Sequence, residues 1–362
     1  MPVKCTVMET MTPRERMEAL AEGKKVDRIP VCPILGEYPS VVAGIPVDRY
    51  LHSSRLMAEA QVQAFYGLGY DSVGVGPDYL GMAEAMGCRL RYAPDERPQL
   101  AASVVEDERS LSRLKPVEAE RDGRLPMYLE ALKTIKDRIG DQVKVGSGVG
   151  GPFTLAACLR GTEEFLKDLI RKPDFAHQIL EISRQSIMNY MEACSRLGVS
   201  CSLGEPLASC SVISPHHFRQ FAKPYLSAIC EWYRSCFGRS LSLHICGITK
   251  PVWEDVAALG VSQFSFDEKE DVEEAKRFIG TRLVIKGNVP PVSVLARGSY
   301  EEVTAAATRC LNKGFDSPKG YVLSSGCTVP LETPPGNIRA LIDASRRFSM
   351  EQAGLGPFVP CR

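Results

Sequence analysis

The sequence predicts an α/β fold, a (β/α)8 (TIM) barrel in which helices surround a ring of eight parallel strands. Two observations lead to this prediction. Short β-type runs alternate with longer amphipathic stretches, and several of the short runs are apolar on both faces, as strands of a buried parallel sheet are. The expected strands are residues 28–35, 71–76, 143–149, 199–203, 241–246, 261–266, 282–287 and 320–325. An open, doubly wound sheet is the alternative, but no Gly-x-Gly-x-x-Gly motif follows the first run.

Helical patterns separate the expected strands. Apolar residues recur at helical spacing in residues 52–66, 126–139, 163–197, 215–236, 249–259, 272–279, 300–313 and 335–348. The longest of these patterns should break near Pro173, because proline cannot continue a helix without losing a hydrogen bond. Ser214 is the expected N-cap of the helix that begins at Pro215.

Two segments depart from this alternation. Residues 1–26 form an N-terminal extension with a helical pattern over residues 13–22, which we expect to cap the barrel. Residues 88–125 are charged and contain prolines, which predicts an insertion after the second strand that lies over the barrel mouth. A solvated hairpin without a chemical role is the alternative for this insertion. No repeat or flexible linker interrupts the chain, so we expect one domain over residues 1–362.

Composition limits the possible functions. Lys+Arg and Asp+Glu both number 44 in 362 residues, which argues against a nucleic-acid-binding surface. No apolar run is long enough to cross a membrane, and the polar N-terminus does not resemble a secretory signal. The thirteen cysteines are odd in number and form no Cys-x-x-Cys pair. Disulfides are therefore not expected, and a reducing cytoplasm is the expected location.

Three metal-prone residues stand out. His244 and Cys246 end the fifth expected strand, and Cys327 follows the eighth. Residues two apart on a strand point to the same side, and barrel enzymes place their active sites at the carboxyl ends of the strands. We therefore expect the imidazole and the two thiols to meet above the barrel axis and to bind zinc. Three protein ligands leave the fourth tetrahedral position open, which is typical of catalytic zinc.

Other polar residues follow the expected strands. Asp267 and Glu84 are the candidate catalytic carboxylates; a carboxylate at this rim could fill the fourth zinc position or accept a hydrogen bond from the His244 ring, and Asp267 is best placed. The candidates for substrate or cofactor binding are Asp78, Gly150, Glu205 and Asn288. Helix caps, loop carboxylates and tight turns are the alternative roles for all of these residues.

Several motifs resemble the uroporphyrinogen decarboxylase superfamily. They are the run from Gly150 to Gly161 (GGPFTLAACLRG), the run from Ile213 to Tyr225 that begins ISP and ends FAKPY, and the KGNV sequence from Lys286 to Val289. The resemblance covers residues 28–348 and implies the same (β/α)8 barrel. Near the N-terminus, however, this sequence differs from the sequences of true uroporphyrinogen decarboxylases. Those enzymes grip substrate carboxylates with an Arg-Gln-Ala-Gly-Arg motif, whereas the corresponding CPILGEYPSVVAGIP here contains no arginine.

The branch that this chain resembles is the cobamide-dependent methyltransferases. His-x-Cys after the fifth strand, a distant cysteine before Pro330, the FSFDE sequence from Phe264 and the AEAMG sequence from Ala83 all fit this branch. The resemblance implies that His244, Cys246 and Cys327 bind zinc, and it suggests roles for Glu84 and Asp267 without fixing them.

The function implied is methyl transfer between a corrinoid (cobalamin) and a small-molecule thiol, methyl ether or methylamine. The corrinoid would arrive on a separate carrier protein that docks at the barrel mouth. Two alternatives are a metal-independent decarboxylase acting on a porphyrinogen and a non-catalytic, corrinoid-binding accessory protein.

Overall fold

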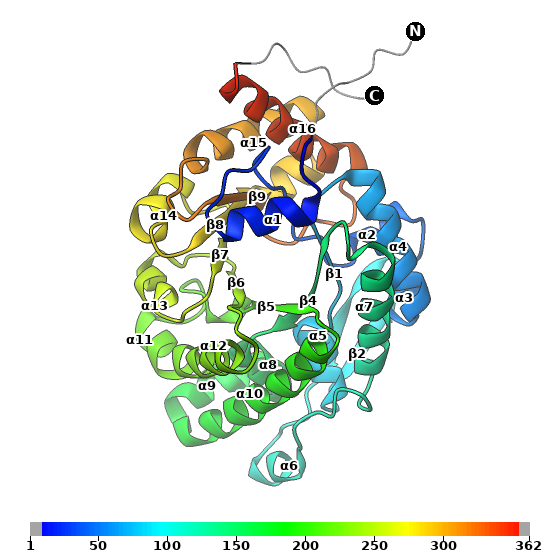
Figure 1. The fold of residues 1–362 in the computed structure, drawn as a ribbon. Helices are drawn as coiled ribbons and strands as arrows, with labels where there is room; N and C mark the ends of the chain where they lie inside the picture. The colour runs from blue at the N-terminus through cyan, green and yellow to red at the C-terminus, as the bar shows by residue number, and fades with distance from the viewer. Residues whose placement is uncertain (1–8, 355–362) are drawn as a thin grey trace.

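The computed structural model describes residues 9–354, in which a ring of parallel strands is surrounded by helices (Figure 1). The sheet has the order β1-β4-β5-β6-β7-β8-β9, and every neighbouring pair is parallel. Its strands are β1 (Ser72–Gly74), β4 (Lys144–Gly150), β5 (Ser200–Gly204), β6 (Ser242–Ile245), β7 (Gln263–Phe266), β8 (Val284–Val289) and β9 (Tyr321–Ser325). The predicted (β/α)8 barrel is confirmed.

The first expected strand, residues 28–35, was wrong in extent. This segment makes only an isolated bridge between Val31 and Leu323 of β9. Pro30 and Pro33 lie on either side of Val31 and Cys32. Because prolines have no backbone N–H, they cannot donate hydrogen bonds to a neighbouring strand. On the other side of the segment, the N–H of Asp71 donates to the carbonyl of Val31 at 2.8 Å. The bridge therefore closes the ring between β9 and the start of β1.

Helices follow the strands around the ring, close to the expected positions (Figure 1). They are α2 (Tyr38–Val42), α3 (Val47–Leu51), α4 (Ser54–Leu68), α5 (Asp78–Ala85), α7 (Leu125–Ile139), α8 (Pro152–Arg160), α9 (Thr162–Arg171), α10 (Pro173–Arg196), α11 (Pro215–His217), α12 (Lys223–Phe237), α13 (Trp253–Ala257), α14 (Val272–Ile279), α15 (Tyr300–Gly314) and α16 (Pro335–Gln352). Single turns of other helical types occur at η1 (Pro206–Ala208), η2 (Phe218–Ala222), η3 (Lys250–Val252) and η4 (Pro291–Ala296). The expected break at Pro173 and the Ser214 cap, which accepts from the N–H of His217, are confirmed. None of the helices in residues 9–354 is long and apolar enough to cross a membrane.

The segment after the second expected strand forms an antiparallel hairpin of β2 (Arg89–Ala93) and β3 (Glu96–Ala102), followed by α6 (Glu108–Arg113). Arg97 and Pro98 of β3 line a cavity at the carboxyl ends of the barrel strands. The hairpin therefore lies at the barrel mouth.

The opposite end of the barrel is covered by α1 (Pro13–Ala21), which crosses the ring in Figure 1. Thr12 and Glu15 form a capping box that begins this helix. Leu20 packs with Cys32 and Val322 from the barrel wall, and Met17 packs against the same cluster. Helix α1 thus caps the barrel at the amino-terminal ends of the strands, so that the cavity opens at the other end. Residues 1–8 of the expected extension lie outside the described residues.

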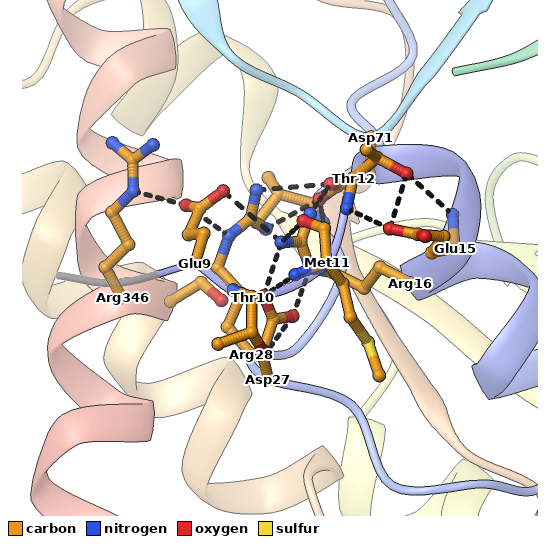
Figure 2. A network of polar contacts seen from close by, with 12 residues as sticks. Glu9, Thr10, Met11, Thr12, Glu15, Arg16, Asp27, Arg28, Asp71 and Arg346 are labelled. Atoms are coloured by element: carbon orange, nitrogen blue, oxygen red, sulfur yellow. Dashed lines mark hydrogen bonds and ion pairs between the residues drawn. The ribbon is translucent and has the colours of Figure 1, made fainter. Parts of the chain in front are cut away.

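A buried ionic network fixes this cap (Figure 2). Asp71, which is fully buried, accepts hydrogen bonds from Arg16 at 2.5 Å, from Arg28 at 2.6 Å and from the N–H of Val31 at 2.6 Å. Arg16 also pairs with Asp27 at 2.6 Å. Burial alone would raise the pKa of Asp27, but the hydrogen bond from Arg16 lowers it below its ordinary value. One carboxylate, Asp71, therefore holds α1, the proline-flanked segment and the start of β1 together.

Replacing the carboxylate of Asp71 should destabilise the packing of α1 against the barrel. We expect Asp71→Asn to lower the free energy of unfolding by about 3–5 kcal/mol, because two buried arginines lose their shared counter-ion. Chemical denaturation followed by circular dichroism measures this loss. The control is Asp137→Asn, which breaks an exposed ion pair with Lys133 and should cost less than about 1 kcal/mol. Equal effects of the two substitutions would show that the network does not carry this stability.

Candidate metal centre

The three metal-prone residues come together at the carboxyl ends of the strands. His244 lies on β6, Cys246 directly follows that strand, and Cys327 follows β9. Alternation along β6 turns His244 and Cys246 toward the barrel interior, while Leu243 and Ile245 are buried on the other face. The distant cysteine is delivered to the same place because β9 belongs to the same closed ring.

The ligand atoms are close enough to share one ion. Nε2 of His244 lies 3.0 Å from Sγ of Cys246, which lies 3.1 Å from Sγ of Cys327. All three atoms are within 4.8 Å of one another, and no other group of this kind occurs within residues 9–354. None of the carboxylates considered for the fourth ligand position belongs to the group. The arrangement is therefore a three-ligand site.

The two thiols influence each other's ionisation. A hydrogen bond from Cys246 lowers the pKa of Cys327, although burial opposes this change. The same contact, with Cys327 as the charged partner, raises the pKa of Cys246. The contact thus favours ionisation of one thiol over the other, and a metal ion bound here would neutralise both thiolates.

Ser265 orients the imidazole. Its Oγ lies 3.0 Å from Nδ1 of His244, and the two residues are direct partners in the β6–β7 ladder. The hydroxyl can hold the proton on Nδ1 and so leave Nε2 free for a metal. The sequence favoured Asp267 for this contact. Asp267 lies past the end of β7, however, and the ladder register places Ser265 opposite the ring.

Asp267 supports the loop that carries Cys246. Its carboxylate accepts hydrogen bonds from the N–H of Gly247 at 2.8 Å and of Lys269 at 3.1 Å. Gly247 has φ +68°, and a side chain there would collide with the hydroxyls of two serines. Asn288 donates to the carbonyls of Asp267 and Glu270 at 2.9 and 2.6 Å. Both residues therefore position the loop around the cluster rather than face the cavity.

The cluster lies in the wall of a cavity of about 440 Å³, a size typical of small-molecule sites. Below the metal-prone residues, the cavity continues into the barrel between Gly74, Gly148, Ser202 and Ser242. A (β/α)8 barrel is usually filled by bulky branched side chains at such inward positions. Small residues here leave room for a ligand.

Two arginines at the cavity mouth are already neutralised. Arg97 pairs with Glu37 at 2.7 Å, and Arg124 pairs with Glu84 at 2.7 Å. Glu84 also accepts a hydrogen bond from Tyr92 at 2.6 Å. Glu84 is thus held in an ion pair that orients Arg124 and is not itself part of the cavity wall.

Asp78 lines the cavity, as expected of a binding residue. It has φ +49°, a conformation that aspartate and asparagine tolerate better than other residues with side chains. Asp78 is exposed within the cavity. Desolvation by the surrounding cavity walls, together with the nearby charge of Glu37, raises the pKa of Asp78 to about 7. Asp78 can therefore exchange a proton near neutral pH.

Glu205 caps a helix, which was the alternative role for it, and Gly150 permits close packing of a helix against a strand. Glu205 is fully buried and accepts hydrogen bonds from the N–H groups of Phe153 and Thr154 at the start of α8. Burial raises the pKa of Glu205 to about 7. A side chain on Gly150 would come within 2.4 Å of Tyr79, so this glycine allows α5 to approach β4. Neither residue lines the cavity.

Sequence reasoning missed four residues of this site: Ser265, Arg97, Arg124 and Lys286. Ser265 could have been found, because it lies between two phenylalanines on its strand, and alternation turns a polar residue in that place to the opposite face. Arg97 and Arg124 belong to the segment after the second strand, where no pattern relates a residue to the barrel.

A (β/α)8 barrel with a His-Cys-Cys cluster at the carboxyl ends of its strands has the architecture of a metal-dependent enzyme. The family model "Uroporphyrinogen decarboxylase (URO-D)" matches residues 12–348, and the chain belongs to this family.

Relatives narrow the assignment to one branch. The chain is 30% identical to the methylcobamide:CoM methyltransferase MtaA of Methanosarcina barkeri over 348 residues, which cover 94% of this chain and 99% of the relative. It is 24% identical to the methylcobamide:CoM methyltransferase MtbA of Methanosarcina acetivorans, with the same coverage. A uroporphyrinogen decarboxylase of Coxiella burnetii is 26% identical over 341 residues, which cover 90% of this chain and 92% of that enzyme.

A solved structure agrees with these relatives. The chain matches a methyltransferase from Methanosarcina mazei with a TM-score of 0.85 and 30% identity, over 93% of this chain and 99% of that one. The resemblance inferred from the sequence, to the cobamide-dependent methyltransferase branch of the family, is confirmed, and so is the enzyme class, a corrinoid-dependent methyltransferase.

Proposed function

We propose that this enzyme binds zinc through His244, Cys246 and Cys327 and transfers a methyl group between a corrinoid and a small-molecule thiol. The observation that carries the proposal is the three-ligand cluster in the wall of the cavity, to which no carboxylate within residues 9–354 adds a fourth ligand. A site of this kind leaves one position for an exogenous ligand.

The donor set fits zinc. Two thiolates and one imidazole are ligands that zinc prefers, and thiolates discriminate against magnesium and calcium. The two sulfurs lie 3.1 Å apart, close enough to bind the same divalent cation as thiolates. Ser265 sets the ring so that Nε2 faces the thiols.

When bound, zinc would keep a fourth, substrate thiol deprotonated at neutral pH and therefore nucleophilic. The residues of the chain do the rest. Asp267 holds the Cys246 loop through Gly247, and the cavity wall aligns the acceptor. Asp78 is suited to take up the proton that the thiol releases, because its pKa is near 7.

The acceptor and the carrier are inferred from the relatives. The names of several relatives specify coenzyme M, a thiol, as the methyl acceptor, and one of them is a methylated-thiol–coenzyme M methyltransferase of Methanosarcina mazei. These names favour a thiol over a methyl ether or a methylamine. A corrinoid is bulky, so we propose that it is presented at the barrel mouth by a carrier protein.

Decarboxylation of a porphyrinogen is less consistent with the site. The arginines that line the cavity, Arg97 and Arg124, are each neutralised by a glutamate. The segment without arginines contributes Glu37 to the cavity wall, and Glu37 is the glutamate that neutralises Arg97. A substrate with many carboxylates would meet little unpaired positive charge at this mouth.

The zinc assignment can be tested through one ligand. Wild-type protein should contain about one zinc ion per chain by elemental analysis. We expect Cys327→Ala to lose the metal but to remain folded, because a rim residue contributes little to core burial. Cys236→Ala provides the control, since Cys236 is an exposed cysteine outside the cluster. Full zinc retention in Cys327→Ala would refute the assignment of Cys327.

The methyl transfer can be tested with free methylcobalamin and 2-mercaptoethanesulfonate. We expect the wild-type enzyme to demethylate the corrinoid, seen as a change in cobalt absorbance, and to form the methyl thioether. Cys327→Ala should lose this activity. A zinc-loaded wild-type enzyme that leaves methylcobalamin intact with this thiol and with other thiols would contradict the proposed reaction and favour the non-catalytic alternative.

Asp78 gives the reaction a predictable pH dependence. Because only the ionised carboxylate accepts a proton, the wild-type rate should fall as the pH drops through about 7. We expect Asp78→Asn to keep its zinc, to lose about a hundredfold in rate and to lose this dependence, since asparagine tolerates the same backbone conformation. A pH–rate profile of Asp78→Asn identical to that of wild type would exclude Asp78 as the proton acceptor.

A further inference from the structure

Lys286 lies inside the barrel in the same row as the metal-prone histidine. Along the sheet, His244 of β6 is paired with Ser265 of β7, which is paired with Lys286 of β8. Lys286 lines the same cavity as His244, Cys246 and Cys327. Two strand spacings separate the backbones of His244 and Lys286 by about 10 Å.

The ammonium group of Lys286 has no counter-ion within residues 9–354. No carboxylate lies within ion-pair distance of it, and it makes no hydrogen bond there, whereas both arginines of the cavity are paired. Burial lowers the pKa of Lys286, which the nearby thiol of Cys32 only partly opposes. An unpaired charge in such a place is costly to a folded protein, so its presence calls for a partner outside the chain.

Other polar groups beside Lys286 are also without protein partners. The side chains of Gln263 on β7, Ser242 on β6 and Ser202 on β5 line the cavity and make no hydrogen bond to other residues in the described part of the chain. The amide and the hydroxyls can each donate a hydrogen bond to an oxyanion. With Lys286 they form a set of donors, which we call the deep polar site.

We propose that the deep polar site, with Lys286 as its cation and Gln263 and Ser242 as donors, binds the anionic group of a short acceptor thiol whose sulfur lies at the metal centre. This inference rests on the proposed function and goes further, since it names the residues that recognise the end of the acceptor remote from the sulfur. Small inward residues such as Gly148 keep the path between the two sites open.

Neutralisation by a ligand accounts for a lysine that the chain leaves unpaired. A sulfonate or carboxylate would receive a charge-assisted hydrogen bond from the ammonium, worth more than a neutral one. The cation lies away from the thiols, so it would hold one end of the acceptor while the sulfur at the other end stays electron-rich.

Binding can be measured without any methyl transfer. We expect isothermal titration calorimetry to detect binding of ethanesulfonate, which lacks a thiol, to the wild-type protein as isolated. Lys286→Met should weaken this binding about 10- to 100-fold. Lys115→Met is the matched control, because Lys115 is an exposed lysine outside the cavity. Equal binding of ethanesulfonate to wild type and Lys286→Met would overturn the proposal.

Kinetics then separate this proposal from the function on which it rests. For 2-mercaptoethanesulfonate and 3-mercaptopropanoate, Lys286→Met should raise KM about 10- to 100-fold, while KM for neutral 2-mercaptoethanol stays unchanged. Comparison of the two anionic thiols shows whether the site prefers sulfonate or carboxylate. Equal loss with the neutral thiol would overturn the anion site alone. Failure of the wild-type enzyme with all three thiols would overturn the proposed function, whereas ethanesulfonate binding would still test the site.

Stability and charge rescue exclude a structural role. Lys286→Met removes a half-buried, unpaired charge, so its melting temperature without ligand should equal or exceed that of wild type. Lys286→Arg, which keeps the charge, should retain more affinity for ethanesulfonate than Lys286→Met. A large drop in melting temperature for Lys286→Met, with no recovery of binding in Lys286→Arg, would assign the lysine to the fold instead.

Discussion

The open interior of the barrel is the constraint on which the rest of the structure depends. Small residues at the inward positions of four strands, Gly74, Gly148, Ser202 and Ser242, leave a cavity where a barrel usually has a packed core. The stability lost there has to come from elsewhere. The outward faces of the strands supply it, because residues such as Leu203, Leu243 and Ile285 are almost completely buried.

Closing one end of the barrel makes the cavity a binding site rather than a channel. The N-terminal helix brings Leu20 against Cys32 and Val322, and Asp71 ties this helix to the wall through two arginines. Buried ion pairs contribute less to stability than their contacts suggest, because the charges must first be desolvated. Their geometric effect is larger here, since they hold a segment that its prolines prevent from forming a full strand.

The sequence was sufficient for the barrel and for the three metal-prone residues, because both follow from periodicities. Alternating apolar runs fix the strand order, and a spacing of two puts His244 and Cys246 on one face. The contacts around these residues depend on register between strands, which no single strand encodes. Because of this register, Ser265 and not Asp267 contacts the imidazole of His244. The same register places Lys286 beside Ser265 on the next strand. Position at a strand end also did not predict which residues line the cavity, since Glu205 caps α8 and Asn288 holds a loop.

The distribution of charge in the cavity suits a substrate with a single anionic group better than a polyanion. At the mouth, Glu37 and Glu84 cancel two arginines, so a polyanion gains little there. Deeper in the barrel, one lysine remains uncompensated and can neutralise a single anionic group. Two thiolates would cancel the charge of a zinc ion, so an added substrate thiolate keeps its own negative charge and its nucleophilicity. Recognition of the far end of the substrate can therefore provide binding energy for alignment without drawing electron density from the reacting sulfur.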